Sequence, residues 1–169
     1  SQRNLVGVTD ATNFIRKLFR LGLIKREQIL GATLQREELH EYTLKFNETV
    51  GKFLAEENKQ GLDYVFLACN PAGAVAGIER NSVAFKSTEI ATVLQYKNQK
   101  EMTGTPHFLM QSKRIAFLAT KADKRRPLAW LYSVDGPANE SPSFLRHIDK
   151  VEKRMTVFID DQALTWPQI

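Results

Sequence analysis

Apolar residues recur every three or four positions through the first third of the chain, which is the spacing of amphipathic helices. The stretch "VTDATNFIRKLFRLGLI" predicts a first helix, with Thr9 or Asp10 as its N-cap and Gly22 near its end. A longer helix is predicted within residues 33–61, where one continuous apolar stripe consists of Leu39, Tyr42, Phe46, Val50, Phe53 and Leu54. The N-terminal third is therefore expected to be helical.

The pattern changes after Asp63 to short apolar or alternating runs separated by turn residues, which favour strands. These runs are "DYVFLAC", "NSVAFK", "HFLMQ", "RIAFLAT", "PLAWLYSV" and "MTVFID". Residues 87–99 fit a helix or a strand equally well. The stretch "SPSFLRHIDKVEKR" predicts a late helix, because Ser-Pro-Ser is typical of a helix start and helical spacing follows it.

Helices followed by strands, without regular alternation, predict an α+β fold rather than a doubly wound parallel sheet. We expect N-terminal helices, one of them long and amphipathic, packed on a mainly antiparallel sheet, with a late helix before the last strand. A chain of 169 residues has the size of one domain, and no repeat or long linker divides it. The expected organisation is a single domain over residues 1–169.

Composition narrows the class of protein without naming a function. The chain is 43% hydrophobic and 25% charged, which is typical of a globular domain. No run approaches the roughly 18 apolar residues of a membrane span, so no membrane partner is expected. Cys69 is the only cysteine, which excludes an intrachain disulfide and slightly favours a reducing intracellular compartment. Localisation is otherwise open.

Positive charge is concentrated in one segment. The chain carries net +5, and residues 97–126 contain eight basic and two acidic residues. Two apolar runs flank "TKADKRRP" and predict a hairpin whose tip carries Lys121, Lys124, Arg125 and Arg126. Basic loops of this kind bind nucleic-acid phosphates. The late helix would add the side chains that share one of its faces, which are Arg146, Lys150 and Arg154.

The stretch "YVFLACNPAGAVAG" is the other candidate for chemistry. A nucleophile elbow needs glycines two residues either side of the nucleophile, but Leu67 and Pro71 flank Cys69. A Walker phosphate loop needs a Gly-Lys-Ser/Thr ending, which is absent after Gly73 and Gly77. We therefore expect Cys69 to pack in the core and a wide turn or hairpin to follow it.

No catalytic residue, metal site or cofactor is predicted. The three histidines are far apart in the sequence, whereas zinc ligands usually come in closely spaced pairs. Aspartates such as Asp160 and Asp161 occur at strand ends, where they also solvate turns.

Three functions are weighed on these grounds. The leading hypothesis is a non-enzymatic domain that binds nucleic acid, DNA or RNA, through the basic hairpin loop. The alternative is a protein–protein interaction subunit or adaptor, with a protein partner or self-association through the first helix, because that helix has more apolar residues than one face needs. An enzyme centred on Cys69 ranks third, because no base or oxyanion hole is recognisable near it.

Overall fold

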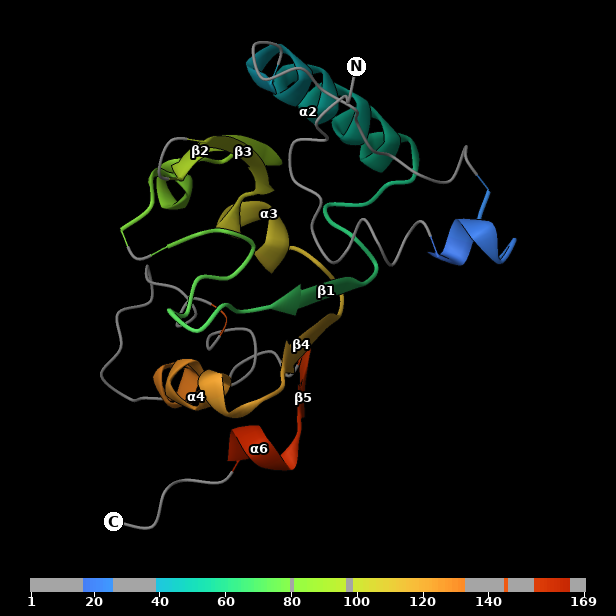
Figure 1. Ribbon diagram of the computed structural model, residues 1–169. Helices are drawn as coiled ribbons and strands as arrows, with labels where there is room; N and C mark the ends of the chain where they lie inside the picture. The colour runs from blue at the N-terminus through green and yellow to red at the C-terminus, as the bar shows by residue number, and fades with distance from the viewer. Residues whose placement is uncertain are drawn as a thin grey trace, which may run out of the picture.

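The computed structural model describes residues 17–25, 39–79, 81–96, 99–132, 145 and 154–164. Its labelled elements follow one another along the chain from a long helix to a short C-terminal one (Figure 1). They are α2 (Leu39–Glu56), β1 (Val65–Ala68), the 3-10 helix η3 (Val83–Lys86), β2 (Ala91–Tyr96), β3 (Gln99–Gly104), α3 (Pro106–Met110), β4 (Ile115–Ala119), the 3-10 helix η4 (Ala122–Lys124), α4 (Arg125–Tyr132), β5 (Met155–Ile159) and α6 (Asp161–Leu164).

The central sheet is parallel. It has three strands in the order β1-β4-β5, with Val65 beside Ile115 and Ile115 beside Met155. Strands β2 and β3 form a separate antiparallel pair between β1 and β4 in the chain. The prediction of a mainly antiparallel sheet is therefore wrong.

The error arises from two predicted strands that are helices. "HFLMQ" lies in α3 and the end of that helix, and "PLAWLYSV" begins in α4. Periodicity does not separate a short apolar run in a strand from one in a helix. The helix signals were nevertheless present, because Thr105 caps α3 by accepting from the Phe108 N–H at 3.1 Å, and a proline follows that cap. With both helices in place, α3 lies in the connection from β1 to β4 and α4 in the connection from β4 to β5, and such crossover connections are what parallel strands require.

Other predictions had mixed outcomes. The structure confirms strands in "DYVFLAC", "RIAFLAT" and "MTVFID", and residues 87–99 prove to contain β2. "NSVAFK" is wrong as a strand, since Ser82 caps the 3-10 helix η3 there. Of the predicted late helix, only Leu145, which is helical and buried, and Arg154, which directly precedes β5, are among the described residues. Gly22, with a φ of 68°, follows a short helix over 17–20, as predicted.

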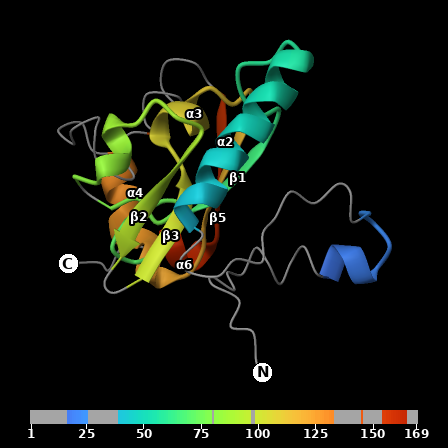
Figure 2. The same ribbon diagram turned by 90° about the horizontal axis from the view of Figure 1, so that it is seen from above.

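The long helix α2 was predicted correctly, but it does not cover the parallel sheet. It lies over the β2–β3 pair, as the view from above shows (Figure 2). Asn47 joins the two, since its side chain accepts from the Ala91 N–H at 2.8 Å and donates to the Ala91 carbonyl at 3.0 Å. Val50 and Leu54 of α2 pack with Phe108 of α3 in a small second core.

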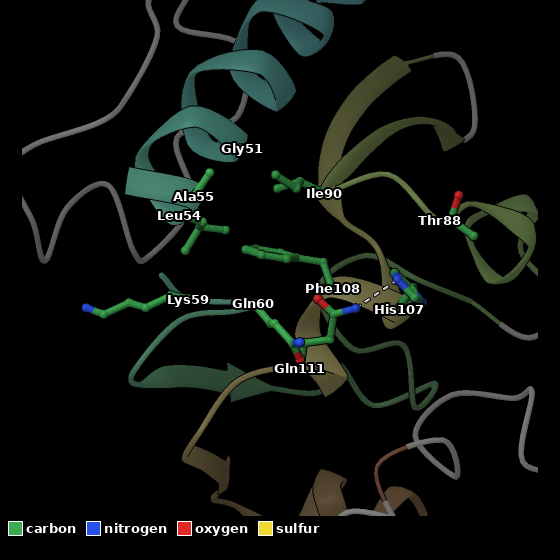
Figure 3. A pocket seen from close by; sticks show the side chains of 10 residues that line it. All are labelled: Gly51, Leu54, Ala55, Lys59, Gln60, Thr88, Ile90, His107, Phe108 and Gln111. Atoms are coloured by element: carbon green, nitrogen blue, oxygen red, sulfur yellow. Dashed lines mark hydrogen bonds between the residues drawn. The ribbon is translucent and has the colours of Figure 1, made fainter. Parts of the chain in front are cut away.

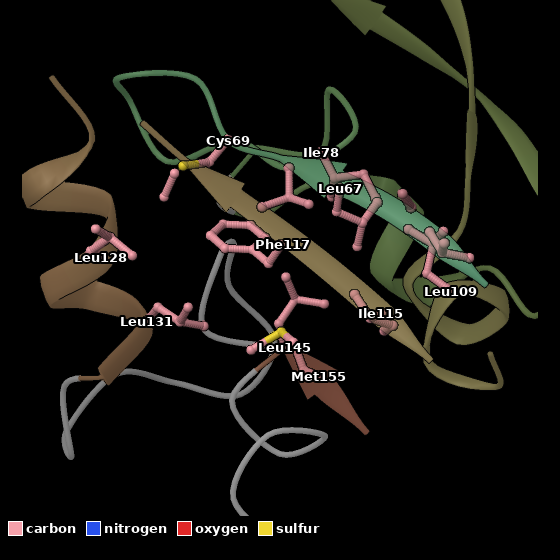
Figure 4. Close-up of a cluster of buried hydrophobic side chains, with 14 of the residues drawn as sticks. Leu67, Cys69, Ile78, Leu109, Ile115, Phe117, Leu128, Leu131, Leu145 and Met155 are labelled. Atoms are coloured by element: carbon pink, nitrogen blue, oxygen red, sulfur yellow. The ribbon is translucent and has the colours of Figure 1, made fainter. Parts of the chain in front are cut away.

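The main core lies on one face of the parallel sheet (Figure 4). Phe117 is fully buried at its centre, between Leu67 of β1 and the helix α4, which contributes Leu128 and Leu131. The opposite face is different, because Phe66, Leu118 and Phe158 are exposed there. In the part of the chain that the structure describes, no helix is long and apolar enough to cross a membrane.

Candidate functional site at the carboxyl edge of the parallel sheet

The three parallel strands end at one edge of the sheet. Asn70, Lys121 and Asp160 each follow within two residues of the end of β1, β4 or β5. Open α/β sheets bind their ligands outside the carboxyl ends of the strands, because the loops there converge on a crevice. This edge is therefore the candidate functional site.

The loop after β1 is held in shape by its own backbone. The Asn70 carboxamide oxygen accepts from the Ala74 N–H at 3.0 Å, and the Asn70 N–H donates to the Ala74 carbonyl at 3.0 Å. Further along, Val75 and Ile78 exchange two backbone hydrogen bonds, and both side chains are fully buried. The result is the predicted wide turn, although a 3-10 helix rather than a strand follows it.

Because the side chains of this loop are small, its backbone groups are not shielded by long side chains. Gly73 and Gly77 have φ values of 90° and 73°, which glycine adopts without strain, and Ala76 has a φ of 52°. Thr103 of β3 fixes the loop from outside, because its hydroxyl donates to the Ala76 carbonyl at 2.5 Å. Residues 70–78 contain no ionisable side chain, so the loop offers close approach rather than an acid or base.

The loops after β4 and β5 are joined by one carboxylate. Asp160 accepts from the Lys121 N–H with both carboxylate oxygens at 3.0 Å, and from the Ala163 N–H at 2.9 Å. The second bond places Asp160 as the N-cap of α6. Lys121 has a φ of 78°. Its backbone N–H donates to Asp160, and its side chain is exposed. Asp160 therefore holds the lysine-bearing turn in place.

Lys124 is the cation that is placed deepest at this edge. Its side chain is only 15% exposed, and its ammonium lies 2.8 Å from a carboxylate oxygen of Asp123. An ammonium has three N–H donors, and Asp123 takes one of them. The positive charge of Lys124 also lowers the pKa of the Cys69 thiol, which lies at the end of β1.

Cys69 is part of the core and not a nucleophile. Burial raises the pKa of its thiol to about 11, and the positive charge of Lys124 opposes only part of this rise. The nucleophilic form of cysteine is the thiolate, so a thiol with this pKa is almost entirely inactive near neutral pH. The side chain packs in the main core, as the sequence indicated.

The predicted basic residues come together only in part. Lys121, Lys124, Arg125 and Arg126 share one turn after β4, but that turn leads into α4 and is not a hairpin tip. Arg125 donates from Nε to the Gln162 carbonyl at 2.8 Å, and the Arg126 guanidinium lies 4.7 Å from the ring centre of Trp130.

Arg154 lies at the opposite end of the sheet from that turn. Its guanidinium donates to the carbonyls of Met110 and Ser112, beside the start of β4. Arg146 and Lys150 lie outside the described residues. The structure therefore does not bring Arg154 next to the turn that carries Lys121 and Lys124.

A hollow of about 250 Å³ lies between α2 and α3, away from the carboxyl edge of the parallel sheet (Figure 3). Leu54 and Phe108 form its apolar side, and the His107 and Gln111 side chains are hydrogen-bonded to each other at 2.9 Å on its polar side. This hollow was not predicted, because "HFLMQ", which contains residues that line it, was interpreted as a strand. Among the residues with described positions, no three His, Cys, Asp or Glu side chains are grouped as metal ligands are.

Fold and edge together define a parallel α/β domain with a largely covered lysine and a small-residue loop at the carboxyl ends of its strands. No protein-family model and no curated protein match the chain. Solved structures do match it. A 6-phosphogluconolactonase from Trypanosoma brucei is similar to this chain, with a TM-score of 0.59 and 20% sequence identity. The similarity covers 86% of this chain and 58% of the lactonase.

Two further solved structures show the same similarity. A 6-phosphogluconolactonase from Plasmodium vivax matches 90% of this chain with 63% of its own, at a TM-score of 0.67 and 16% identity. A monomeric glucosamine-6-phosphate deaminase of the NagB superfamily is similar over 66% of this chain and 50% of its own chain, with a TM-score of 0.53 and 20% sequence identity. The chain therefore has the Rossmann-like α/β fold of these proteins, and it spans about three-fifths of the length of the lactonases.

These similarities correct the predicted function. All three matching proteins are enzymes named for sugar phosphates, which overturns the predictions of a non-enzymatic protein and of a nucleic-acid or protein partner. The physical reason lies in the segment that carried those predictions. The basic hairpin does not exist, and its cations lie instead near the carboxyl edge of a parallel sheet, where open α/β sheets generally bind their ligands.

Proposed function

We propose that this chain is the sugar-phosphate-binding part of an enzyme that acts on a hexose phosphorylated at its 6-position. The observation that carries the proposal is Lys124, a lysine whose side chain is only 15% exposed, near the carboxyl edge of a parallel sheet. The names of the matching enzymes, a 6-phosphogluconolactonase and a glucosamine-6-phosphate deaminase, have a sugar 6-phosphate in common. The reaction class that they suggest is lactone hydrolysis or removal of an amine.

The chemistry of the edge supports a phosphate ligand. A phosphate near neutral pH carries between one and two negative charges and accepts several hydrogen bonds. Lys124 supplies a cation in a poorly solvated position, where a charge–charge interaction is screened less than at the surface. The exposed Lys121 supplies a second positive charge three residues away, and the loop over 70–78 lets a ligand approach the backbone. Asp123 keeps the Lys124 ammonium in place when no ligand is bound.

Calorimetric titration tests the proposal with 6-phosphogluconate and glucosamine 6-phosphate as probes. Gluconate and glucosamine, which lack the phosphate, serve as the control ligands. We expect the phosphorylated compounds to bind and Lys124→Met to weaken them by about tenfold to a hundredfold, the usual effect of losing a hydrogen bond to a charged group. Lys113→Met is the control, because it removes the same charge two residues before β4 rather than after it.

Three results would contradict this function: no binding at millimolar concentrations, equal affinity for the unphosphorylated compounds, or equal loss in both lysine variants. Assays of lactone hydrolysis and of ammonia release on the same protein then separate the two reaction classes.

A further inference from the structure

The loop after β1 contains a tight turn with an unfavourable residue in it. Val75 and Ile78 exchange two backbone hydrogen bonds, at 2.9 and 3.3 Å, across the two residues between them. Both of those residues, Ala76 and Gly77, have positive φ values, of 52° and 73°. Two-residue hairpin turns of this kind favour Asn-Gly or Gly-Gly, because a positive φ brings a Cβ too close to the backbone. The alanine at position 76 therefore needs support from outside the turn.

Thr103 of β3 supplies that support. Its side chain is buried, and its hydroxyl donates to the Ala76 carbonyl at 2.5 Å, although the two residues are 27 positions apart. The Gly104 carbonyl is the other acceptor within reach, at 3.3 Å, and because a hydroxyl has one proton, the shorter contact takes it. On the same face of β3, a carboxylate oxygen of Glu101 lies 3.8 Å from where a Cβ on Gly77 would be. Strand β3 therefore holds the turn from one side.

The turn is connected to the carboxyl end of β1 by short backbone contacts. Val75 forms a bridge with Cys69, the residue that follows β1. Next to that bridge, Ala74 and Asn70 share two hydrogen bonds, one between their backbones and one to the Asn70 side chain, both at 3.0 Å. Residues 69–78 are therefore one hydrogen-bonded unit. A change in the turn should displace the backbone at the candidate site.

Space for part of a ligand lies beside the turn. Ala76 and Gly77 are exposed, and Gly77 lines a hollow of about 270 Å³. The hollow has an apolar wall at Leu94 of β2 and polar side chains around it, among them Ser82 and Gln95. Its volume is just below the roughly 300 Å³ at which pockets for whole ligands begin, so it suits one portion of a ligand. Mixed polar and apolar walls of this kind suit the hydroxyls and carbons of a sugar.

We propose that Thr103 is a positioning residue for the sugar part of the ligand. Through its bond to Ala76 it holds the turn at 75–78, and with it the loop after β1, in the conformation that binds the sugar. The inference rests on the proposed function, in which Lys124 binds the phosphate and this loop meets the rest of the molecule. Thr103 acts through the turn and does not itself touch the ligand.

Calorimetric titration tests this role with 6-phosphogluconate and inorganic phosphate as probes. Thr103→Val removes the hydroxyl and keeps the branched shape of the side chain. We expect it to weaken 6-phosphogluconate binding about threefold to tenfold, the usual worth of one hydrogen bond. Inorganic phosphate should bind as before, because it meets Lys124 and not the loop. Thr103→Ser keeps the hydroxyl and should bind both probes as the unmodified protein does.

Thr92→Val is the matched control, because Thr92 lies directly opposite Thr103 on β2 and loses the same hydroxyl. Thr103→Ala repeats the test without placing a methyl group against the Ala76 carbonyl. Undiminished 6-phosphogluconate binding in both Thr103 variants, equal weakening of both probes, or the same loss in Thr92→Val would overturn the role of Thr103 alone. An unmodified protein that binds no 6-phosphogluconate would overturn the proposed function and this role together.

Hydrogen exchange separates a displaced turn from a general loss of stability, and it needs no ligand. The Val75 and Ile78 amides donate within the turn, whereas the Phe117 amide lies in the central strand β4 and follows the stability of the whole domain. In Thr103→Val, the turn amides should exchange about threefold faster or more relative to Phe117 than in the unmodified protein. An unchanged ratio would contradict the proposal, because the hydroxyl would then stabilise the domain without positioning the turn.

Discussion

The two ends of the parallel sheet both carry basic side chains, yet they use them differently. At the amino end, Arg154 donates to the carbonyls of Met110 and Ser112, and Lys113 is paired with Asp63 at 2.8 Å. At the carboxyl end, Lys124 is paired with only its neighbour Asp123 among the ion pairs of the described residues, and the loops around it are built from small residues. The amino-end cations hold distant parts of the chain together, whereas Lys124 is the residue for which we propose a ligand.

The comparison teaches that the role of a cation depends on the groups within its reach. All of these residues looked alike as charges along the sequence. Backbone carbonyls gather at the amino end, where the chain turns into its strands, and an arginine satisfies them. The strand ends on the other side lead into loops that carry Asn70, Lys121 and Asp160. Four substitutions test this difference between the two ends, and their expected effects fall from the first to the fourth.

The first change is Gly61→Ala at the amino end. A Cβ built on Gly61 would lie 2.5 Å from the carbonyl oxygen of Gln111, and because that oxygen belongs to the backbone it does not move aside easily. We expect the free energy of unfolding to fall by about 3 kcal/mol, as overpacking does elsewhere. Urea denaturation measures this loss. Gly51→Ala is the control, since its Cβ would approach nothing closer than Ile90 at 3.8 Å.

The second change is Arg154→Met, which keeps much of the aliphatic stem and removes the guanidinium. Two backbone carbonyls in a partly buried position lose their donor, so we expect a loss of stability of about 2 kcal/mol. Binding of 6-phosphogluconate to the folded variant should stay as in the unmodified protein. A variant of normal stability with weakened binding would reverse the roles that we assign to the two ends.

The third change is Asp160→Ala at the carboxyl end. It removes the cap of α6 and the acceptor for the Lys121 N–H. Loss of an N-cap costs about 1 kcal/mol, measured as a lower midpoint of thermal unfolding. Because the turn that carries Lys124 is then less restrained, sugar-phosphate binding should weaken as well. Asp161→Ala is the control, as the neighbouring carboxylate in the same helix.

The fourth change concerns acid and has the smallest effect. Lys113 and Lys59 hold the pKa of Asp63 at about 2, below its ordinary value of 3.8. Because the folded pKa is the lower one, the ion pairs stabilise the fold above about pH 4 and lose their effect as the pH falls towards 2. Asp63→Asn should flatten the acid limb of the stability profile slightly at low salt. Since the group is exposed, high salt should remove the difference.

Local sequence patterns predicted several elements well. The stripe through Leu39, Val50 and Leu54 identified α2 because helical periodicity depends only on residue spacing. Gly22 ended its helix because a left-handed residue favours glycine. The strands around Phe66, Phe117 and Val157 were recognisable from their aromatic and branched residues.

The sequence identified the basic residues of the candidate site but not the elements that carry them. The cluster of Lys121, Lys124, Arg125 and Arg126 was identified from charge alone. Its setting was not, because α3 and α4 are too short for periodicity to separate from strands. Once "PLAWLYSV" was read as a strand, a hairpin and a nucleic-acid surface followed from it. The cap at Thr105 and the proline at position 127 were the signals that would have prevented this error.

The sequence by itself determined the long amphipathic helix α2, the glycine after the first helix and the burial of Cys69. These properties depend on a few neighbouring residues. Only the tertiary structure decided that β1, β4 and β5 run parallel, that Lys124 stands at their carboxyl ends and Arg154 at the other, and that Phe66 is exposed. The pairing of strands about fifty residues apart depends on how whole elements pack, and no local pattern encodes it.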